Sequence, residues 1–288
     1  MHKDSSLHLS ADRQAQNDAV IRTTVLVRRK IMLLAIDIGN TTISIAILRE
    51  NPRKPAQPKI ILIHQVETSL SPTVLRKKLK QKLSALTRRY KVRDAIICSV
   101  VPPALKLLKN ILRKDLNMKP LVIGEGILVP IRNRYRNPRQ VGQDRLVCSF
   151  AARELYGAPL IVIDFGTAIT FDVVSDKGEY LGGIIVPGIR LTAEALFNKT
   201  ALLPKVKIKT PRELIGRDTT SSILSGIFYG YGALCDGLID LISRKAKGRS
   251  KVVLTGGYSP LMKKFMTHQV HCLDRDLVFK GMSFVSRR

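Results

Sequence analysis

The sequence predicts an α/β fold made of two similar halves, and three observations support this prediction. An apolar strand ending in Asp-x-Gly, a small polar turn and a second apolar strand occur twice, at residues 33–45 and 160–172. Stretches with strand-like and helix-like apolar spacing alternate after each copy. The length of 288 residues allows two domains that each bury a core.

The copy at residues 160–172 has the chemistry of a phosphate site. Its first strand ends at Asp164, and Gly166, Thr167 and Thr170 follow around a predicted hairpin turn. Glycine lets the backbone approach a ligand closely, and backbone N–H groups and threonine hydroxyls donate hydrogen bonds to an anion. Because the carboxylate would face a polyanion, a cation is expected between them. For a single copy, an ordinary hairpin with an acidic turn is the alternative.

The second copy weakens that alternative. Asp37, Gly39, Asn40 and Thr41 repeat the same order about one domain's length earlier in the chain. Two copies predict two related domains that offer their hairpins to the phosphates of a nucleotide. This arrangement resembles the actin-like ATPase superfamily, which includes sugar kinases, acetate kinase and heat-shock chaperones. The resemblance implies two ribonuclease-H-like domains with the nucleotide in the cleft between them, and it leaves the substrate open.

In the first half, the spacing of apolar residues predicts the remaining elements. Residues 59–67 alternate as a third strand, and four leucines at helical spacing give 72–87 the pattern of a helix. Residues 95–100 form a buried strand, a Pro-Pro pair opens a helix that runs to 112, and 120–123 form another strand. A long connection with few apolar residues follows at 124–141, and such loops are often functional.

In the second half, a helix at 146–156 precedes the second hairpin. The elements expected after it are a strand with a glycine-rich bend at 178–188, a helix at 189–197, a long helix ending near 243, a strand at 252–257 and a final helix at 276–284. The long helix carries four glycines, which suggests close packing against a neighbour. The residues expected to form the apolar border of that face are Ile223, Ile227, Tyr231 and Leu234.

Composition limits the classes of function. The net charge is +27, and a basic protein can bind nucleic acid by neutralising phosphates. However, Lys and Arg are spread along the chain, aromatic residues are only 5%, and no helix-turn-helix or zinc-finger spacing occurs. We therefore expect a solvated basic surface without a specific nucleic-acid partner, with non-specific binding at low salt.

The cysteines and the N-terminus indicate a cytoplasmic protein without a membrane partner. The four cysteines are far apart in the sequence, as expected for buried thiols in a reducing compartment. No stretch reaches the roughly 18 apolar residues that a membrane span needs. Residues 1–31 are polar, and Arg22 interrupts the only candidate for a secretory apolar core. We interpret 1–31 as a disordered basic extension, 32–141 as the first domain and 142–288 as the second, with Met32 as a second possible initiator.

Asp144 lies at or near the start of the helix that precedes the second hairpin. Its simple interpretation is an acidic N-cap. The neighbouring Arg145 suggests another, in which the arginine pairs with an anionic substrate while Asp144 handles a proton.

Five short motifs, in order, resemble one family. They are Asp-Ile-Gly-Asn-Thr at 37–41, Gly-Gln-Asp-Arg at 142–145, Asp-Phe-Gly-Thr-Ala-x-Thr at 164–170, Gly-Glu-Tyr-Leu-Gly-Gly at 178–183 and Thr-Gly-Gly at 255–257. From about residue 32 to the C-terminus, the sequence resembles type III pantothenate kinase. The resemblance implies ATP-dependent phosphorylation of pantothenate to 4'-phosphopantothenate, the first step of coenzyme A biosynthesis, by a cytoplasmic homodimer.

The resemblance also implies roles for individual residues. Asp144 matches the proton acceptor, Asp164 matches the ligand of an activating monovalent cation (K⁺ or NH₄⁺), and Mg²⁺ is expected with ATP. The implied ATP-binding residues are Asp37, Ile38, Gly39, Asn40, Thr41, Thr42, Ile43, Ser44 and Thr167. The implied pantothenate-binding residues are Tyr135, Gly142, Gln143, Asp144, Arg145 and Thr219, the last supplied by the second subunit.

Two departures and two rival functions accompany this interpretation. The family usually has Ala where Gln143 stands, so a narrower pocket is expected. It usually has Asn where Asp218 stands, so weaker binding of the anionic substrate is expected unless the arginines offset the added charge. One rival is a kinase or phosphatase of the superfamily with another substrate, and the motif at 142–145 argues against it. The other is a non-catalytic regulatory relative, and the retained Asp144 and Asp164 argue against that.

Overall fold

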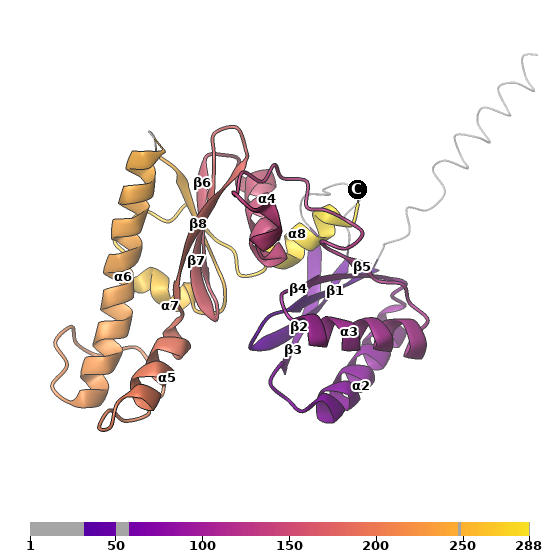
Figure 1. The fold of residues 1–288 in the computed structure, drawn as a ribbon, viewed down its shortest axis with the longest axis horizontal. Coiled ribbons are helices and arrows are strands. Elements are labelled where there is room, and N and C mark those ends of the chain that lie inside the picture. Colours follow the sequence, from indigo (N-terminus) through magenta and orange to yellow (C-terminus); the bar gives the residue numbers. More distant parts are fainter. Residues whose placement is uncertain (1–31, 50–57, 247–248, 288) are drawn as a thin grey trace, which may run out of the picture.

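The computed structural model describes residues 32–49, 58–246 and 249–287. The extension expected at 1–31 lies outside these residues. Within them, the chain forms two five-stranded sheets with helices packed on their faces (Figure 1).

The first sheet combines an antiparallel meander with parallel strands. Its strands are β1 (Met32–Ile38), β2 (Thr42–Arg49), β3 (Lys59–Glu67), β4 (Asp94–Ser99) and β5 (Leu121–Val122), in the order β3-β2-β1-β4-β5. β2 is antiparallel to β1 and β3, whereas β1, β4 and β5 are parallel. The helices α2 (Pro72–Tyr90) and α3 (Pro102–Asn110), with the π-helical turn η1 (Ile111–Asp115), cover its outer face.

The second sheet repeats this topology. Its strands are β6 (Leu160–Phe165), β7 (Ala168–Val174), β8 (Tyr180–Pro187), β9 (Lys251–Thr255) and β10 (Cys272–Leu273), in the order β10-β9-β6-β7-β8. β7 is antiparallel to β6 and β8, and β6, β9 and β10 are parallel. The helices α5 (Ile189–Lys199), α6 (Thr219–Lys245) and α7 (Ser259–Met262) cover its outer face. The internal repeat seen in the sequence is therefore a repeat of topology.

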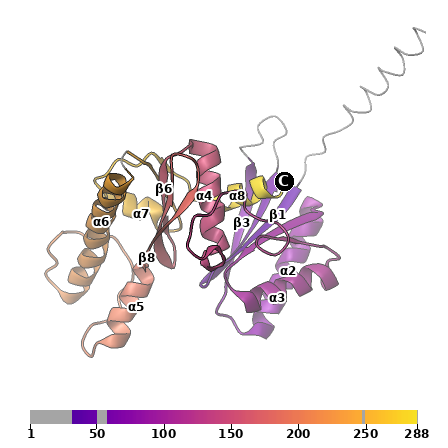
Figure 2. The same cartoon turned by 45° about the horizontal axis from the view of Figure 1, so that its top comes forward.

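Two helices, α4 (Gln143–Tyr156) and α8 (Leu277–Val285), form a layer between the sheets (Figures 1 and 2). The C-terminal helix α8 returns to the first sheet, where it contacts β1, β2 and β4 as well as α4. Close contact is possible because Gly281 lacks a side chain: a Cβ there would lie 2.6 Å from the carbonyl oxygen of Val147. The division at residue 141 stays a prediction, since α4 contacts strands of both sheets and α8 contacts the first sheet.

Strand alternation decides which side chains face this inner layer. In β1, Leu33 and Ala35 point toward α4 and α8, whereas Leu34 and Ile36 pack under α2 and α3. In β6, Leu160 and Val162 point inward and Ile161 and Ile163 point outward. Because successive side chains alternate, Asp37 and Asp164 continue the two inward series at the ends of their strands.

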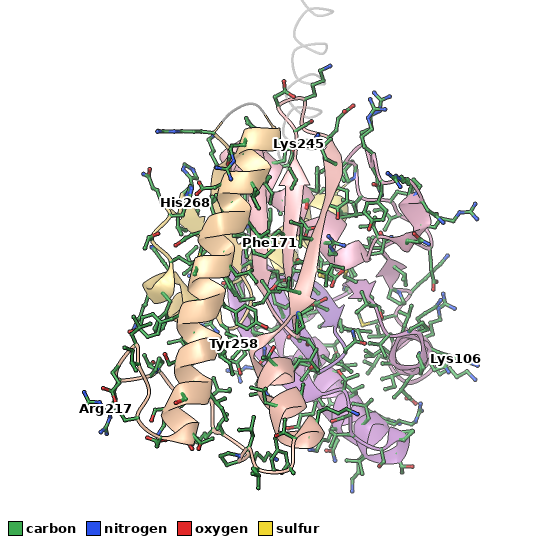
Figure 3. The ribbon with its side chains drawn as sticks, turned by 60° about the vertical axis from the view of Figure 1, so that its left-hand side comes forward. Lys106, Phe171, Arg217, Lys245, Tyr258 and His268 are labelled. Carbon is green, nitrogen blue, oxygen red and sulfur yellow. The ribbon has the colours of Figure 1, made fainter. Side chains whose placement is uncertain are left out.

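Among the described residues, α6 is the one helix long and apolar enough to cross a membrane by length and composition. It runs along the outer face of the second sheet, over Phe171 (Figure 3), and buries Phe228, Cys235 and Ile239 in that core. Cys98, Cys148 and Cys235 are buried free thiols, as expected, and Cys272 is half-buried.

Candidate functional site

The site is built from two strand ends that occupy equivalent places in the two sheets. Asp37 lies between Ser44 of β2 and Cys98 of β4, and Asp164 lies between Thr170 of β7 and Thr255 of β9. Both carboxylates thus precede a hairpin turn on the central strand of their sheet.

The two hairpin turns touch each other directly. The hydroxyl oxygens of Thr41 and Thr167 lie 2.8 Å apart and share a hydrogen bond, although the residues come from different sheets. The backbone of the first turn is tightened by the amide of Gly39, which donates to the carbonyl of Thr42 at 3.0 Å. The turns therefore form one continuous polar surface, as the two sequence motifs predict.

Glycines leave space around the Asp164 carboxylate. A Cβ at Gly256, which has φ +86°, would lie 2.2 Å from Asp164 Oδ1, and a Cβ at Gly166 would lie 3.3 Å from the same oxygen. The Thr-Gly-Gly motif at the end of β9 and the hairpin motif at the end of β6 thus meet at this carboxylate. A side chain at Gly256 would displace the Asp164 carboxylate, whereas one at Gly166 would require only a small shift.

Asp144 joins these residues from the first turn of α4. Its helix begins three residues earlier than the sequence pattern predicts, and the N-cap is Gly142. The interpretation of Asp144 as the N-cap is therefore wrong: its Oδ1 instead accepts a 2.8 Å hydrogen bond from the amide of Arg145. A Cβ on Gly142 would lie 2.5 Å from this Oδ1 and 3.5 Å from Val100, just beyond β4. A side chain at Gly142 would therefore displace the Asp144 carboxylate, whereas its contact with Val100 would be an ordinary one.

Burial raises the pKa values of all three carboxylates, and neighbouring carboxylates add to the effect at Asp37 and Asp164. Burial is the main cause, and it raises the pKa of Asp37 to about 8 with help from Asp144 and Asp164. Burial likewise raises the pKa of Asp164 to about 7, with contributions from Asp144 and Asp172. The pKa of Asp144 is raised by burial and held down in part by the Arg145 amide and guanidinium. The side chains keep partial access to solvent, so they form an electrostatically strained cluster open to a ligand.

This cluster suits a cation that arrives with other ligands. Carboxylates and hydroxyls are hard oxygen donors of the kind that Mg²⁺ and monovalent cations prefer. Among the described residues, no group of three or more His, Cys, Asp or Glu side chains is arranged to hold a metal ion. Mg²⁺ commonly uses only one or two carboxylates and completes its shell with water and substrate phosphates. The residues present therefore fit a cation bound together with nucleotide.

The Arg145 side chain is held by the buried carboxylate of Asp172, which was not predicted as a site residue. Its Nε donates to Asp172 Oδ1 at 2.8 Å, and this oxygen also accepts from the hydroxyl of Tyr180 at 2.8 Å. Thr170 donates to the other oxygen at 2.9 Å. Nη2 of Arg145 lies 2.7 Å from Asp172 Oδ1, but without hydrogen-bond geometry, so this buried nitrogen has no hydrogen-bond partner.

Tyr135 approaches the same network through the long connection. Residues 132 and 134 exchange backbone hydrogen bonds with Tyr180, so the connection extends the second sheet beside β8. The ring of Tyr135 then lies about 3.4 Å from the place of a Cβ on Gly182, and its centroid is 6.5 Å from that of Tyr180. A Cβ on Gly183 would meet Arg145 Nη2 at 2.6 Å. Gly183 therefore leaves room for the Arg145 guanidinium and for the carbonyl of Phe171, 1.9 Å from the same Cβ, whereas Gly182 makes an ordinary contact with the Tyr135 ring.

Gln143 and Asp218, the two departures from the family pattern, have local partners. The Gln143 side chain packs against Gly124, where a Cβ would lie 3.0 Å from its Cδ. Asp218 is the N-cap of α6 and accepts a 2.9 Å hydrogen bond from the amide of Ser221. Hydrogen bonds from Ser221 lower the pKa of Asp218. The extra negative charge is thus engaged by the helix that follows it.

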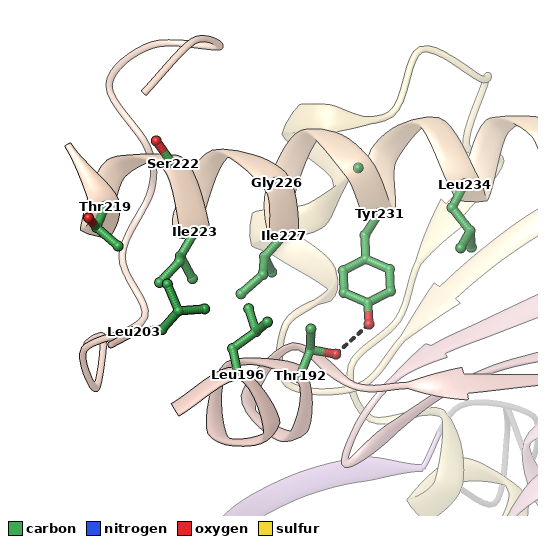
Figure 4. A pocket seen from close by; sticks show the side chains of 11 residues that line it. Thr192, Leu196, Leu203, Thr219, Ser222, Ile223, Gly226, Ile227, Tyr231 and Leu234 are labelled. Carbon is green, nitrogen blue, oxygen red and sulfur yellow. Dashed lines mark hydrogen bonds between the residues drawn. The ribbon is translucent and has the colours of Figure 1, made fainter. Parts of the chain in front are cut away.

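Thr219 is the predicted site residue that the chain does not bring to the others. It begins α6 and lines an apolar groove of about 480 Å³ between α5 and α6 (Figure 4). The helix that Thr219 begins, α6, covers the outer face of the second sheet, whereas α4, which carries Asp144, packs on the inner face.

The comparison with known proteins decides the family. A model of the type III pantothenate kinase family matches residues 33–241. The chain belongs to the type III pantothenate kinase family. A type III pantothenate kinase of Persephonella marina is 41% identical over 256 residues, covering 87% of this chain and 96% of the relative. One from a Sulfurihydrogenibium species is 38% identical over 264 residues, covering 89% and 100%.

Solved structures show the fold of this pantothenate kinase family member. A conserved Baf family protein from Campylobacter jejuni has a TM-score of 0.53 at 20% identity, with 88% of this chain and 97% of that chain covered. The ethanolamine utilization protein EutJ from Carboxydothermus hydrogenoformans has a TM-score of 0.50 at 13% identity, covering 98% and 99%. The expected actin-like ATPase fold is confirmed. So is the expected activity of an ATP-dependent pantothenate kinase, which transfers phosphate to an alcohol.

Proposed function

We propose that the cleft around Asp37, Asp144 and Asp164 is where the γ-phosphoryl group of ATP passes to the primary hydroxyl of pantothenate. The observation that carries this proposal is the convergence of both hairpin turns, joined by the 2.8 Å contact of Thr41 and Thr167, on the three carboxylates. Phosphoryl transfer depends mainly on positioning and charge stabilisation, which such a surface can supply. Residues 37–44 and Thr167 are the proposed ATP contacts.

Asp144 is the proposed proton acceptor. The hydroxyl oxygen of pantothenate forms a bond to the γ-phosphorus while the bond from that phosphorus to the β–γ bridging oxygen breaks, and the hydroxyl proton passes to the Asp144 carboxylate. A carboxylate with a raised pKa is a better base than an ordinary aspartate, provided that it is ionised at the working pH. The hydrogen bond from the Arg145 amide favours the ionised form.

Asp37 and Asp164 are proposed to interact with cations. In the protein alone, burial and mutual repulsion disfavour their ionisation, and a bound cation would reverse this effect. The ATP dependence of the family implies a divalent cation with the nucleotide, which we take to be Mg²⁺. Asp164, enclosed by Gly166 and Gly256, is the proposed ligand of an activating K⁺ or NH₄⁺.

The pantothenate end of the site is proposed to lie at Tyr135, Gly142, Gln143 and Arg145. Pantothenate carries a carboxylate, and an arginine donor is a suitable partner for it. Although Asp172 engages Arg145, the buried Nη2 retains an unused donor. That donor and the Tyr135 ring lie against the same Gly182–Gly183 segment.

A homodimer would bring Thr219 to this site from a second copy of the chain. A Cβ added at Gly226 or Gly230 would meet nothing within 4 Å, so this part of α6 is open, whereas Gly232 packs closely within the chain, against Phe265. Ile223, Ile227, Tyr231 and Leu234, the residues expected beside these glycines, line the same groove as Gly226 and Gly230, although Ile223 and Ile227 are largely buried. Large apolar residues nevertheless remain exposed around α5 and the start of α6: Leu191, Phe197, Leu202, Leu214 and Ile215. A cytoplasmic homodimer that covers them is therefore proposed.

A coupled ADP-release assay tests the proposed function. Purified protein is given ATP and Mg²⁺ with pantothenate, a sugar or acetate, in potassium, ammonium or sodium buffer. Of the three acceptors, we expect only pantothenate to be phosphorylated. We also expect a higher rate in potassium or ammonium buffer than in sodium buffer. Equal rates in sodium and potassium would contradict the assignment of a monovalent cation to Asp164. Phosphorylation of the sugar or acetate but not of pantothenate would contradict the proposed pantothenate site.

A further inference from the structure

The helical layer on the outer face of the first sheet is strongly basic. α2 carries seven basic residues and no acidic residue, and α3 with η1 carries four basic residues and one acidic residue, Asp115. These basic residues are Arg76, Lys77, Lys78, Lys80, Lys82, Arg88, Arg89, Lys106, Lys109, Arg113 and Lys114.

Within the residues that the structure describes, most of this positive charge has no acidic partner. Asp115 pairs with Arg76 at 2.9 Å and Lys80 at 3.2 Å, and Glu125 pairs with Lys109. In the part of the chain that the structure describes, no ion pair involves the other basic residues of the layer. Lys78 and Lys82 are also like charges at i and i+4, an arrangement that destabilises a helix. An external polyanion would relieve this repulsion.

We propose that the outer face of α2 and α3 binds the phosphate backbone of a nucleic-acid duplex without sequence preference. At 19 residues α2 is about 28 Å long, and a duplex presents one phosphate charge per roughly 1.7 Å of its axis. Exposed basic residues occur from the first turns of α2 (Lys77 and Lys78) to its last turn (Arg88 and Arg89). The helix can therefore follow a stretch of backbone on the order of eight base pairs.

The remaining side chains favour a duplex over other anionic surfaces. All four leucines of α2 are buried in the core, and Val74 is the one large apolar residue of α2 that is exposed. The outer face of α2 therefore has no apolar stripe that could insert into a lipid surface. Single-strand binding normally uses aromatic residues that stack on bases. The one aromatic residue of α2, Tyr90, is half-buried beneath Arg89, whose guanidinium carbon is 5.5 Å from the ring centroid.

This surface is separate from the proposed kinase site. Strand alternation turns Asp37 toward α4 and α8, whereas α2 and α3 cover the opposite face of the same sheet. Binding of a duplex to this face would therefore leave the cleft accessible, and loss of binding and loss of kinase activity can be told apart.

Fluorescence anisotropy with a labelled DNA duplex of about 20 base pairs tests the proposal, measured across a range of KCl concentrations. The test variant combines Lys77→Glu, Lys78→Glu, Arg88→Glu and Lys106→Glu. The matched control combines Lys245→Glu, Arg249→Glu, Lys263→Glu and Lys264→Glu, which change the net charge equally at exposed positions away from α2 and α3 (Figure 3 shows Lys106 and Lys245). Thermal unfolding and pantothenate kinase activity are measured for both variants.

We expect the wild type to bind with a log–log salt slope of about −4, which corresponds to four or five phosphate contacts. The test variant should lose at least about 100-fold in affinity at low salt and about 3 units of slope, while its kinase activity stays normal. The control should keep the slope and lose less than about tenfold in affinity. Equal losses in both variants would assign binding to overall charge, and tighter binding to phosphatidylserine vesicles than to duplex would assign the face to a membrane. Either result, or no binding by the wild type, would overturn the proposal.

Discussion

At the residue scale, Asp172 links the interior of the second sheet to the proposed substrate site. It is 1% exposed and accepts hydrogen bonds from Arg145, Tyr180 and Thr170. Burial raises its pKa, and the Arg145 charge is the largest opposing influence. Arg145 directly follows the proposed base, Asp144. By holding the Arg145 guanidinium, Asp172 positions the group that we assign to the pantothenate carboxylate.

Replacing Asp172 by Asn should impair binding more than turnover. The variant leaves the Arg145 charge without its buried partner, which typically costs about 3–5 kcal/mol of stability. We expect the KM for pantothenate to rise by about tenfold, with a smaller change in kcat, because Arg145 moves. Tyr180→Phe is the matched control, since it removes one hydrogen bond to the same oxygen without unpairing a charge. A folded Asp172→Asn enzyme with a normal KM would show that Arg145 is positioned without it.

Asp37 should make the stability of the ligand-free protein depend on pH. Its pKa is about 8 in the folded protein and near 3.9 when unfolded, so between these values the folded state holds a proton that the unfolded state has released. The contribution of Asp37 to the unfolding free energy therefore declines as pH rises from about 4 to 8.

Urea unfolding of the wild type and Asp37→Asn over this pH range, without nucleotide or divalent cation, measures that decline. We expect the variant to gain stability relative to the wild type as pH rises, and added Mg²⁺–ATP to narrow the difference. A difference that does not vary with pH would mean that the pKa of Asp37 is ordinary in solution.

The residue-scale comparison also shows what the sequence could reveal about the site. Asp37, Asp144 and Asp164 were found because each lies in a short motif with glycine or threonine beside it. Asp172 was missed, although an acidic residue inside a buried apolar strand is itself a signal that a partner exists. That partner, Arg145, is remote in sequence, so spacing alone could not reveal it.

At the element scale, apolar spacing predicted most helices and strands because their buried residues follow the 3.6 and 2.0 periods. The third strand runs from Lys59 to Glu67 as predicted, and the α2 helix extends the predicted range by one turn. The early start of α4 was missed because Gly142 is a weak cap signal. The place of α8 between the sheets was also missed, since its apolar residues do not say which surface they cover.

The α4–α8 contact can be tested through Gly281. Alanine there would bring a Cβ within 2.6 Å of both the Val147 carbonyl oxygen and its Cγ1, so α8 must shift. We expect Gly281→Ala to lower the unfolding free energy by about 1–3 kcal/mol, despite the better helix propensity of alanine. Gly237→Ala in α6, where nothing lies within 4 Å of the added atom, should be neutral or stabilising. If both variants are equally stable in urea titrations, α8 does not pack closely on α4.

At the scale of the whole molecule, the repeated hairpin motif predicted two related sheets, and the structure has them in matching strand order. Composition and periodicity could not predict how subunits assemble, because assembly depends on which apolar side chains stay exposed after folding. Exposed apolar side chains occur around α5 and the start of α6, the helix that Thr219 begins.

Subunit mixing tests whether the site is shared. Asp144→Asn and Thr219→Arg subunits should each be inactive alone, and a mixed dimer should regain activity because one of its two sites is intact. Light scattering at moderate salt should first show a dimer, since two +27 chains repel each other and salt screens that repulsion. An active monomer would exclude the dimer, and no recovery despite subunit exchange would place Thr219 outside the partner's site.

The most direct test of the central claim is the rate of 4'-phosphopantothenate formation by Asp144→Asn at saturating ATP and pantothenate. The asparagine keeps the size of the side chain and an oxygen for the Arg145 amide, but it cannot accept the hydroxyl proton. We predict a folded protein with normal ATP affinity and a rate roughly 10²–10⁴-fold below that of the wild type. A rate close to that of the wild type would contradict the assignment of this cleft as the place where the proton is accepted.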